Sequence, residues 1–211
     1  YAVYQRDPSL VTIGGGLVRV TPDNTVTIIE TPADTFLLPD DIALDAEGRI
    51  YVSDRGRRAV LRFMPDGSGG AVWWMPLEGG DTRAAPTGLA YDPLHDAIIV
   101  TDSHLDTVYR VALDGQTVET LYAHDAQSDM PGFDGVAVTP DGAIYIAALA
   151  LNRVVELAGG ELVTLAEGFR GVNDAAYHNG RLYVTNFDSF SLVVQAIHPR
   201  LPFALDVIEL E

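Results

Sequence analysis

The stretch PDDIALDAEGRIYVSD, residues 39–54, joins two apolar segments through an acidic turn, and it recurs along the chain. Three further copies are PTGLAYDPLHDAIIVTD (86–102), FDGVAVTPDGAIYIAA (133–148) and VNDAAYHNGRLYVTN (172–186). One equivalent position is occupied in turn by Asp40, Thr87, Asp134 and Asn173, at spacings of 47, 47 and 39 residues. A period of this length indicates a repeat protein, so the stretch is one copy of a structural unit.

Two further apolar runs follow each copy, so each repeat contains four predicted strands, which we name a to d in chain order. The third runs are 59–63, 107–111, 153–157 and 192–197, and the fourth runs are 71–75, 117–121, 162–166 and 204–210. β-Branched residues dominate these runs, and turn sequences such as PDG and LDG separate them. Four short strands in a repeat of this length predict a blade of a β-propeller.

The predicted fold is therefore an all-β propeller of four-stranded blades, forming a single domain over residues 1–211. The blades are 1–30, 39–78, 86–124, 133–167 and 172–211, and the first matches only strands b, c and d. An open ring leaves strand edges unpaired, and repeat arrays need complete ends. Either residues upstream of Tyr1 supply the missing strand and a sixth blade, or five blades close with an unusual inner edge. We favour a six-bladed ring.

Composition narrows the classes of partner. The chain has 30 acidic residues against 13 basic ones, all of them Arg, and a formal net charge of −17. Such a surface repels phosphate backbones and anionic lipids, so we expect no nucleic-acid partner. No run of 18 apolar residues exists, so we expect no membrane insertion. The absence of Cys excludes disulfides and thiolate metal sites. We slightly favour an extracellular or periplasmic location.

Blade geometry sorts the polar residues onto two faces. The d–a linkers and b–c loops emerge on one face, here called the linker face, and the a–b and c–d turns emerge on the other. Asp40, Thr87, Asp134 and Asn173 lie in linkers and are expected to converge at the mouth of the central channel. Converging oxygen ligands suit a hard divalent cation such as Ca²⁺, and the alternative is a polar channel lined with water.

The linker face also carries candidate residues for the rim of a ligand site. They are Arg55, Asp102, His104, Asn152, Asn173 and Asn186. Asp54, Asp102 and Asn186 all end strand b, so we also expect them to cap the b–c loops through side-chain-to-backbone hydrogen bonds. The remaining copy has Ala148 at this position, which breaks the pattern.

At these residues the chain resembles the NHL and SMP-30/gluconolactonase group of β-propellers. The NHL-like phrase P-x-G-I/L-A-x-D…G-x-I/L-Y-V-x-D is matched by residues 39–54 and 86–102, and more loosely twice again. SMP-30-like lactonases are six-bladed enzymes with one divalent metal at the channel mouth, bound by Glu, Asn and Asp side chains. The resemblance implies metal ligands at Asp40, Thr87 and Asp134. Thr87 departs from the Asn of the family motif and is a poorer ligand.

Two functions from different classes stay open. The first is an NHL-type binding or scaffold module that takes a small molecule or a protein on the linker face. The second is an SMP-30-like metal-dependent lactone hydrolase, with Asp134 as ligand or base and Arg55 and His104 at the substrate rim. A lyase similar to the streptogramin-inactivating propellers would need a His base, which only His104 and His124 offer on this face. No GxSxG, HExxH or phosphate-binding motif is present, so we favour the binding module.

Overall fold

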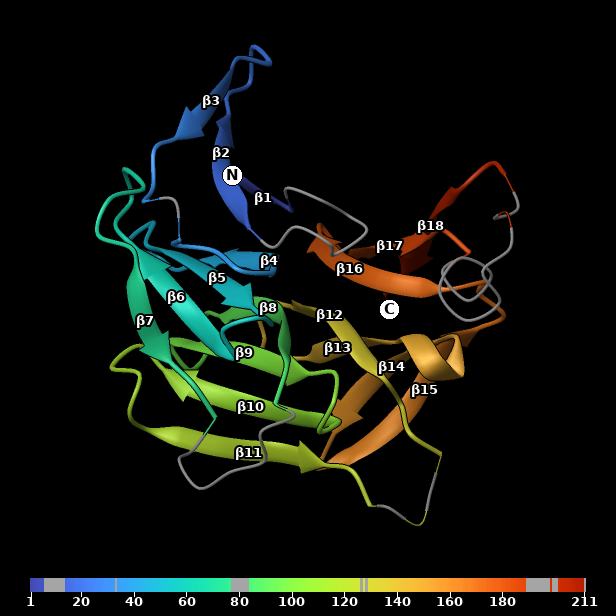
Figure 1. The fold of residues 1–211 in the computed structure, drawn as a ribbon. Helices are drawn as coiled ribbons and strands as arrows, with labels where there is room; N and C mark the ends of the chain where they lie inside the picture. The colour runs from blue at the N-terminus through green and yellow to red at the C-terminus, as the bar shows by residue number, and fades with distance from the viewer. Residues whose placement is uncertain are drawn as a thin grey trace.

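The computed structural model describes residues 1–5, 14–32, 34–76, 84–125, 127, 129–188, 198 and 201–210. These residues form five antiparallel sheets that follow one another as the blades of a propeller (Figure 1). The predicted β-propeller fold is confirmed. In the part of the chain that the structure describes, no helix is long and apolar enough to cross a membrane.

The three central blades have four strands each. The second blade contains β4 (Pro39–Leu44), β5 (Ile50–Asp54), β6 (Ala59–Phe63) and β7 (Ala71–Trp74). The third contains β8 (Pro86–Asp92), β9 (Ala97–Asp102), β10 (Thr107–Ala112) and β11 (Val118–Ala123). The fourth contains β12 (Phe133–Val138), β13 (Ile144–Ala148), β14 (Arg153–Ala158) and β15 (Glu161–Glu167), with a short 3₁₀ helix, η1 (Leu149–Leu151), in its b–c loop.

The first and fifth blades have three described strands each. The first contains β1 (Ala2–Gln5), β2 (Gly15–Val20) and β3 (Val26–Ile29), which match strands b, c and d. The fifth contains β16 (Val172–His178), β17 (Arg181–Asn186) and β18 (Ala204–Glu209). The sequence predicts 204–210 as strand d, and this is wrong: β18 pairs along the whole of β17 and takes the place of strand c. The predicted third run, 192–197, lies outside the described residues.

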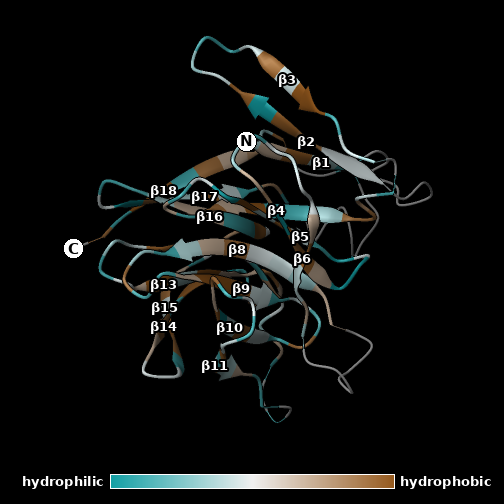
Figure 2. Cartoon of the chain, turned by 90° about the vertical axis from the view of Figure 1, so that its left-hand side faces the viewer, coloured by the Kyte–Doolittle hydropathy of each residue, from teal (hydrophilic) through white to brown (hydrophobic). Residues whose placement is uncertain are grey.

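The hydrophobic core lies between neighbouring blades. Every residue of β5, β9 and β13 is buried, because each of these strands has a blade on both of its faces. Figure 2 shows the contrast at the outer edge of the first blade, where the hydrophobic β3 lies beside β2 and its residues Val26 and Ile28 are exposed. The near-continuous apolar runs of the sequence are thus explained by two-sided burial.

Two adjacent tryptophans at the end of β7 show how a bulge changes the side-chain pattern. Alternation along a strand predicts that Trp73 and Trp74 point to opposite faces. Both instead pack with the core cluster between the second and third blades. The register shifts between Val60 and Leu61, so Val60 pairs with Trp74, Leu61 pairs with Val72, and Trp73 is the extra residue.

A second set of bulges shapes the inner strands. β4, β8, β12 and β16 each begin with one residue pair to strand b, followed by a register shift over the next two residues. In β4 the shift lies between Pro39 and Ile42, so Asp40 and Asp41 form the bulge. The bulge residues therefore lie at the linker-face end of each inner strand, beside the central channel.

A buried hydroxyl at the next-to-last position of strand b fixes the bulges of the second and third blades. Ser53 Oγ accepts a hydrogen bond from Asp41 N (2.9 Å) and donates one to Thr87 O of the next blade (2.5 Å). Thr101 Oγ1 likewise accepts from Gly88 N (2.8 Å) and donates to Asp134 O (2.6 Å). Each hydroxyl ties the bulge of its own blade to that of the following blade, so the inner strands are held in register around the channel.

Candidate functional site at the channel mouth

The bulge residues of three blades enclose a hollow of about 90 Å³, which we call the mouth hollow. Its lining residues are Asp40, Asp41, Asp134, Gly135, Asn173 and Asp174. They come from β4, β12 and β16, which are far apart in the sequence and meet only because the blades are arranged around one channel. Four carboxyl groups and one carboxamide thus converge at one point.

Two polar contacts organise the hollow. Arg55 Nε lies 3.0 Å from Asp40 Oδ2, which makes an ion pair, although the angle between the groups is too poor for a hydrogen bond. On the other side, Asn173 Nδ2 donates a hydrogen bond to Asp134 Oδ2. Asp40 Oδ2 is buried, and its described partner is the guanidinium group of Arg55.

The carboxyl groups of the mouth hollow disfavour one another's ionisation. Burial raises the pKa of Asp134 to about 8, and the neighbouring Asp40 adds to the rise. Burial also raises the pKa of Asp40, against the opposing effect of Arg55. Asp174 is exposed to solvent, and its partial desolvation by the surrounding strands raises its pKa. Arg55 alone does not neutralise the four carboxyl groups of the mouth hollow. A bound cation would therefore lower the electrostatic energy of the hollow.

Glycine permits the close approach of the inner strands. A Cβ atom on Gly88 would overlap Asp134 O and lie 2.9 Å from Gly135 Cα. A Cβ on Gly135 would overlap the carboxyl group of Asp174 and lie 2.7 Å from its Cα. The second bulge position is therefore glycine in the third and fourth blades and an acid, Asp41 or Asp174, in the second and fifth.

The structure brings some of the predicted residues together and separates others. Asp40, Asp134 and Asn173 line the mouth hollow, and Arg55 reaches its edge through Asp40. Thr87 does not line it. The side chain of Thr87 is buried, and its hydroxyl donates to Ala85 O (2.7 Å) and contacts Ser103 Oγ (2.8 Å).

The predicted rim residues at the ends of strand b act on the loops. Asp102 accepts hydrogen bonds from Ala85 N, His104 N and Leu105 N. Asn186 accepts one from Arg170 N and donates to Asp206 Oδ2. Asp54 accepts from Leu37 N, Leu38 N and Arg57 N. The bonds of Asp54 and Asp102 are the loop caps expected from the sequence, and they join the b–c loop of each blade to the linker beside it. The bonds of Asn186 instead join the linker before its blade to β18.

The remaining predicted residues lie in loops of the linker face outside the mouth hollow. His104 is exposed in the b–c loop of the third blade. His124 is half-buried after β11, and neither of its ring nitrogens has a hydrogen-bond partner among the described residues. Asn152 follows η1 with a left-handed backbone (φ 52°), and its Oδ1 is buried without a described partner.

A second hollow, which the sequence reasoning missed, lies deeper in the channel. This channel cavity has a volume of about 390 Å³ and is lined by all four inner strands. Its walls are residues 41–44 of β4, 89–91 of β8, 136–138 of β12 and 174–177 of β16. Most of these side chains are small or apolar and belong to no motif, so only their placement in the fold identifies them.

No protein-family model matches the chain. Virginiamycin B lyase from Staphylococcus aureus has a similar structure, with a TM-score of 0.61 and 11% identity over 79% of this chain and 54% of that one. A chain of the nidogen/laminin complex gives a TM-score of 0.64 and 19% identity over 82% and 64%. A gluconolactonase from Xanthomonas campestris gives 0.59 and 18% over 80% and 61%.

These similarities establish the β-propeller fold and no more, because all three identities are low. The chain spans 54% to 64% of the length of the three similar chains. They include a lyase, a gluconolactonase and a component of a protein–protein complex. The β-propeller fold therefore occurs both in enzymes and in protein-binding modules. The function of this chain has to be inferred from the residues of its site.

Proposed function

We propose that this protein is a ligand-binding propeller module whose binding surface is the linker face, with a divalent cation held in the mouth hollow. The observation that carries the proposal is the convergence of four carboxyl groups and one carboxamide on a single hollow. Carboxylate and amide oxygens are the donors that Ca²⁺ prefers, and flexible coordination suits ligands from separate strands.

The size of the mouth hollow supports an ion rather than an organic substrate. A hollow of about 90 Å³ is well below the range of about 300–1,000 Å³ that is typical of sites for organic ligands, so it suits an ion with its waters. A ligand on the linker face would then complete the coordination from outside, and the loops capped by Asp54 and Asp102 would form a firm rim beside it.

The side chains that line the mouth hollow carry oxygen atoms suited to bind a cation, but one of these side chains has to rotate first. Among the described residues, no three His, Cys, Asp or Glu side chains are already arranged to hold a metal ion. The carboxamide of Asn173 turns its NH₂ toward Asp134, and this hydrogen bond stabilises the ionised form of the Asp134 carboxyl group. Rotation of this carboxamide would present its oxygen to the ion, and the shared cation would offset the repulsion among Asp40, Asp134 and Asp174.

The second candidate is a metal-dependent lactone hydrolase, and the position of Asp134 favours it. Its carboxyl group lines the hollow, and its raised pKa of about 8 lies close to neutral pH. A group with a pKa in this range is suited to proton transfer. A bound divalent cation polarises a carbonyl oxygen. Arg55, at the edge of the hollow, would orient a polar substrate through its guanidinium group.

Calorimetric titration with Ca²⁺, Mg²⁺ and Mn²⁺ near pH 8 tests the cation site. We expect saturable binding by the unmodified protein and at least tenfold weaker binding by Asp134→Asn and by Asp40→Asn, because each variant removes one charged oxygen ligand. Asp129→Asn removes an exposed charge from the linker region and is the matched control. Equal binding by all four proteins, or by none, would contradict the proposal.

Turnover of δ-gluconolactone with and without the ion separates the two candidate functions. A binding module leaves the rate of lactone hydrolysis at its buffer value. Metal-dependent turnover that is lost in Asp134→Asn would favour the hydrolase over the binding module.

A further inference from the structure

Every contact between neighbouring blades joins two kinds of face. We call the face of a blade that is turned toward the next blade in chain order its forward face, and the opposite face its back face. Val60, on the forward face of the second blade, packs in one core cluster with Leu89 and Val100 of the third blade. Corresponding clusters join the third blade to the fourth and the fourth to the fifth. In this protein a forward face is therefore covered by the back face of the following blade.

The forward face of the fifth blade is exposed. Leu205 lies opposite Thr185, on the side of the sheet away from the cluster that the fifth blade shares with the fourth. The equivalent residues of the three preceding blades are fully buried valines, namely Val60, Val108 and Val154. Leu205 is 62% exposed. The fifth blade therefore keeps the apolar residue of a blade contact at a position that is open to solvent.

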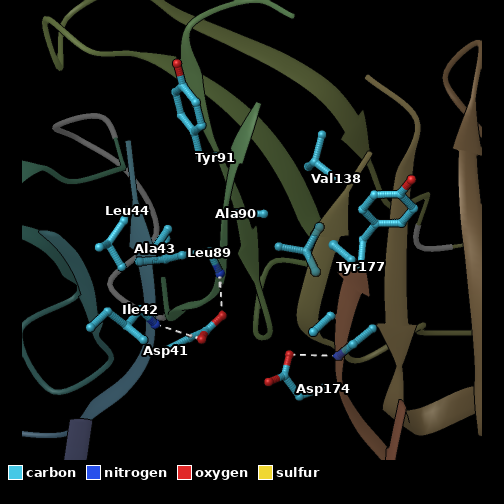
Figure 3. Close-up of a pocket in the computed structure, with 14 residues that line it drawn as sticks. Asp41, Ile42, Ala43, Leu44, Leu89, Ala90, Tyr91, Val138, Asp174 and Tyr177 are labelled. Atoms are coloured by element: carbon cyan, nitrogen blue, oxygen red, sulfur yellow. Dashed lines mark hydrogen bonds between the residues drawn. The ribbon is translucent and has the colours of Figure 1, made fainter. Parts of the chain in front are cut away.

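The inner and middle strands of the fifth blade extend this apolar surface. An alanine occupies one equivalent position in all four inner strands, and Figure 3 shows two of these residues, Ala43 and Ala90. Ala43 is buried between the second and third blades, whereas Ala176 of the fifth blade is exposed. Ala176 and the exposed Val207 both lie opposite Tyr183. The forward face thus presents apolar side chains from three adjacent strands.

The back face of the first blade is exposed as well. Leu17 and Ile29 of this blade pack on the second blade, so alternation along the strands turns Val20, Val26 and Ile28 toward the opposite side. Val20 lies opposite Val26 in the sheet, which makes the apolar surface continuous across β2 and β3. Ile28 is 59% exposed, and the two valines are exposed with it.

The two exposed faces are the complementary halves of one blade contact. The first blade contacts the second through β1 and β4, and the fifth contacts the fourth through β16, β12 and β13 (Figure 1). Both faces are open to solvent in the same molecule, so they do not cover each other within one chain. Single exposed apolar residues are ordinary on a protein surface, but continuous patches indicate contact surfaces. A second copy of the chain offers each face the same kind of partner that covers the faces between blades.

We propose that copies of this chain associate head to tail, with the forward face of the fifth blade of one copy packed on the back face of the first blade of the next. The contact is heterologous, so a dimer keeps one free face of each kind and can add further copies. The net charge of −17 opposes the approach of two copies, and salt screens this repulsion. Association should therefore strengthen with added salt. It does not depend on the cation proposed for the mouth hollow.

Sedimentation equilibrium of the full chain from about 10 µM to about 1 mM, in about 0.3 M NaCl, tests the association. We expect the weight-average mass to rise with concentration from that of the 22.7 kDa monomer to at least about twice this value. A monomer at every concentration would refute the proposal and leave the two faces to another occupant, such as a sixth blade.

Two variants localise the contact. Leu205→Glu and Ile28→Glu each place a charge on one of the two faces at an exposed position, so each protein should fold and remain a monomer at about 1 mM. Val163→Glu is the matched control, because Val163 is 51% exposed on β15, the outer strand of the fourth blade. Its association should stay within about twofold of that of the unmodified protein. With folding checked by circular dichroism, association that persists in either face variant, or that is lost in the control, would place the contact elsewhere.

An equimolar mixture of the two face variants tests the head-to-tail arrangement. Each variant keeps one intact face, and the two intact faces are of opposite kind. The mixture should therefore form a dimer with one copy of each variant and grow no further. A contact between two like faces would instead let one variant dimerise alone, and a mixture that stays monomeric would also refute the proposal.

Discussion

Replacing Thr101 with Val tests whether the strand-b hydroxyl groups hold the ring of inner strands in register. Valine keeps the branched shape of threonine and removes the hydroxyl, so little empty volume is created. Thr101 is fully buried, and its hydroxyl serves two backbone groups of different blades, Gly88 N and Asp134 O. In Thr101→Val both backbone groups lose their partner inside the protein.

The expected loss of stability follows from these two groups. A buried polar group left without a partner costs about 1–3 kcal/mol, and the apolar Val side chain recovers part of this. We therefore expect Thr101→Val to lower the free energy of unfolding by about 2–4 kcal/mol. Chemical denaturation followed by circular dichroism measures this, with the slope of the transition checked for a change in the unfolded state.

A matched substitution provides the control. Thr185 occupies the same position in the fifth blade, but it is exposed and its hydroxyl bonds only to Asp174 of its own blade. Water replaces such a partner, so Thr185→Val should cost less than about 1 kcal/mol. If the two variants lose equal stability, or if Thr101→Val loses less than about 1 kcal/mol, the inter-blade hydrogen bonds do not hold the ring.

Three further predictions concern the same ring of residues. Ala147 stands where the second, third and fifth blades have Ser or Thr, so Ala147→Ser should raise the free energy of unfolding by about 0.5–1.5 kcal/mol in denaturation experiments, and a loss would contradict the equivalence of these blades. Gly135→Ala should destabilise the protein by at least about 2 kcal/mol, measured in the same way, because the new Cβ overlaps Asp174, and a neutral effect would refute the close approach. Because the pKa of Asp134 is raised to about 8, the folded state keeps a proton that the unfolded chain releases above about pH 4. Stability should therefore fall as pH rises from about 4 to 8, by up to about 1.4 kcal/mol per pH unit, and this fall should be smaller in Asp134→Asn; an unchanged slope in denaturation midpoints at pH 5, 7 and 9 would count against the raised pKa.

The blades could be predicted because their signals are local. The repeat period, the turn residues and the apolar runs all lie within stretches of the chain that fold next to one another, as in residues 39–54. The position of β18 could not be predicted, because strand order depends on which segment pairs with β17. A second apolar run, 192–197, has a similar composition, so the sequence did not distinguish the two.

Convergence at the mouth was predictable for Asp40, Asp134 and Asn173, because equivalent positions of a repeat meet around its axis. The exception, Thr87, follows from an interaction inside its own blade. The hydroxyl group of Thr87 donates to Ala85 O and contacts Ser103 Oγ. An ionised carboxylate at this position could not donate to the carbonyl, so a threonine forms local bonds that an aspartate would not. One signal that could have been used is the Ser or Thr before the last residue of strand b, as in Ser53, Thr101 and Thr185.

The channel cavity arises where the repeat departs from its own pattern. Gly88 and Gly135 let β8, β12 and β16 approach one another closely, and Asp41 and Asp174 occupy the same position in the two flanking blades. Asp41 uses this position to bind Leu89 N of the next blade, which explains one acid by structure alone. Asp174 has the same place in its blade, but it is exposed, and among the described residues its carboxyl group accepts a hydrogen bond only from Ala175 N of its own strand. The comparison of Asp41→Asn with Asp174→Asn therefore measures the bond between blades: Asp41→Asn should lower the free energy of unfolding more, because only Asp41 bonds to a neighbouring blade, and equal losses in chemical denaturation would contradict this.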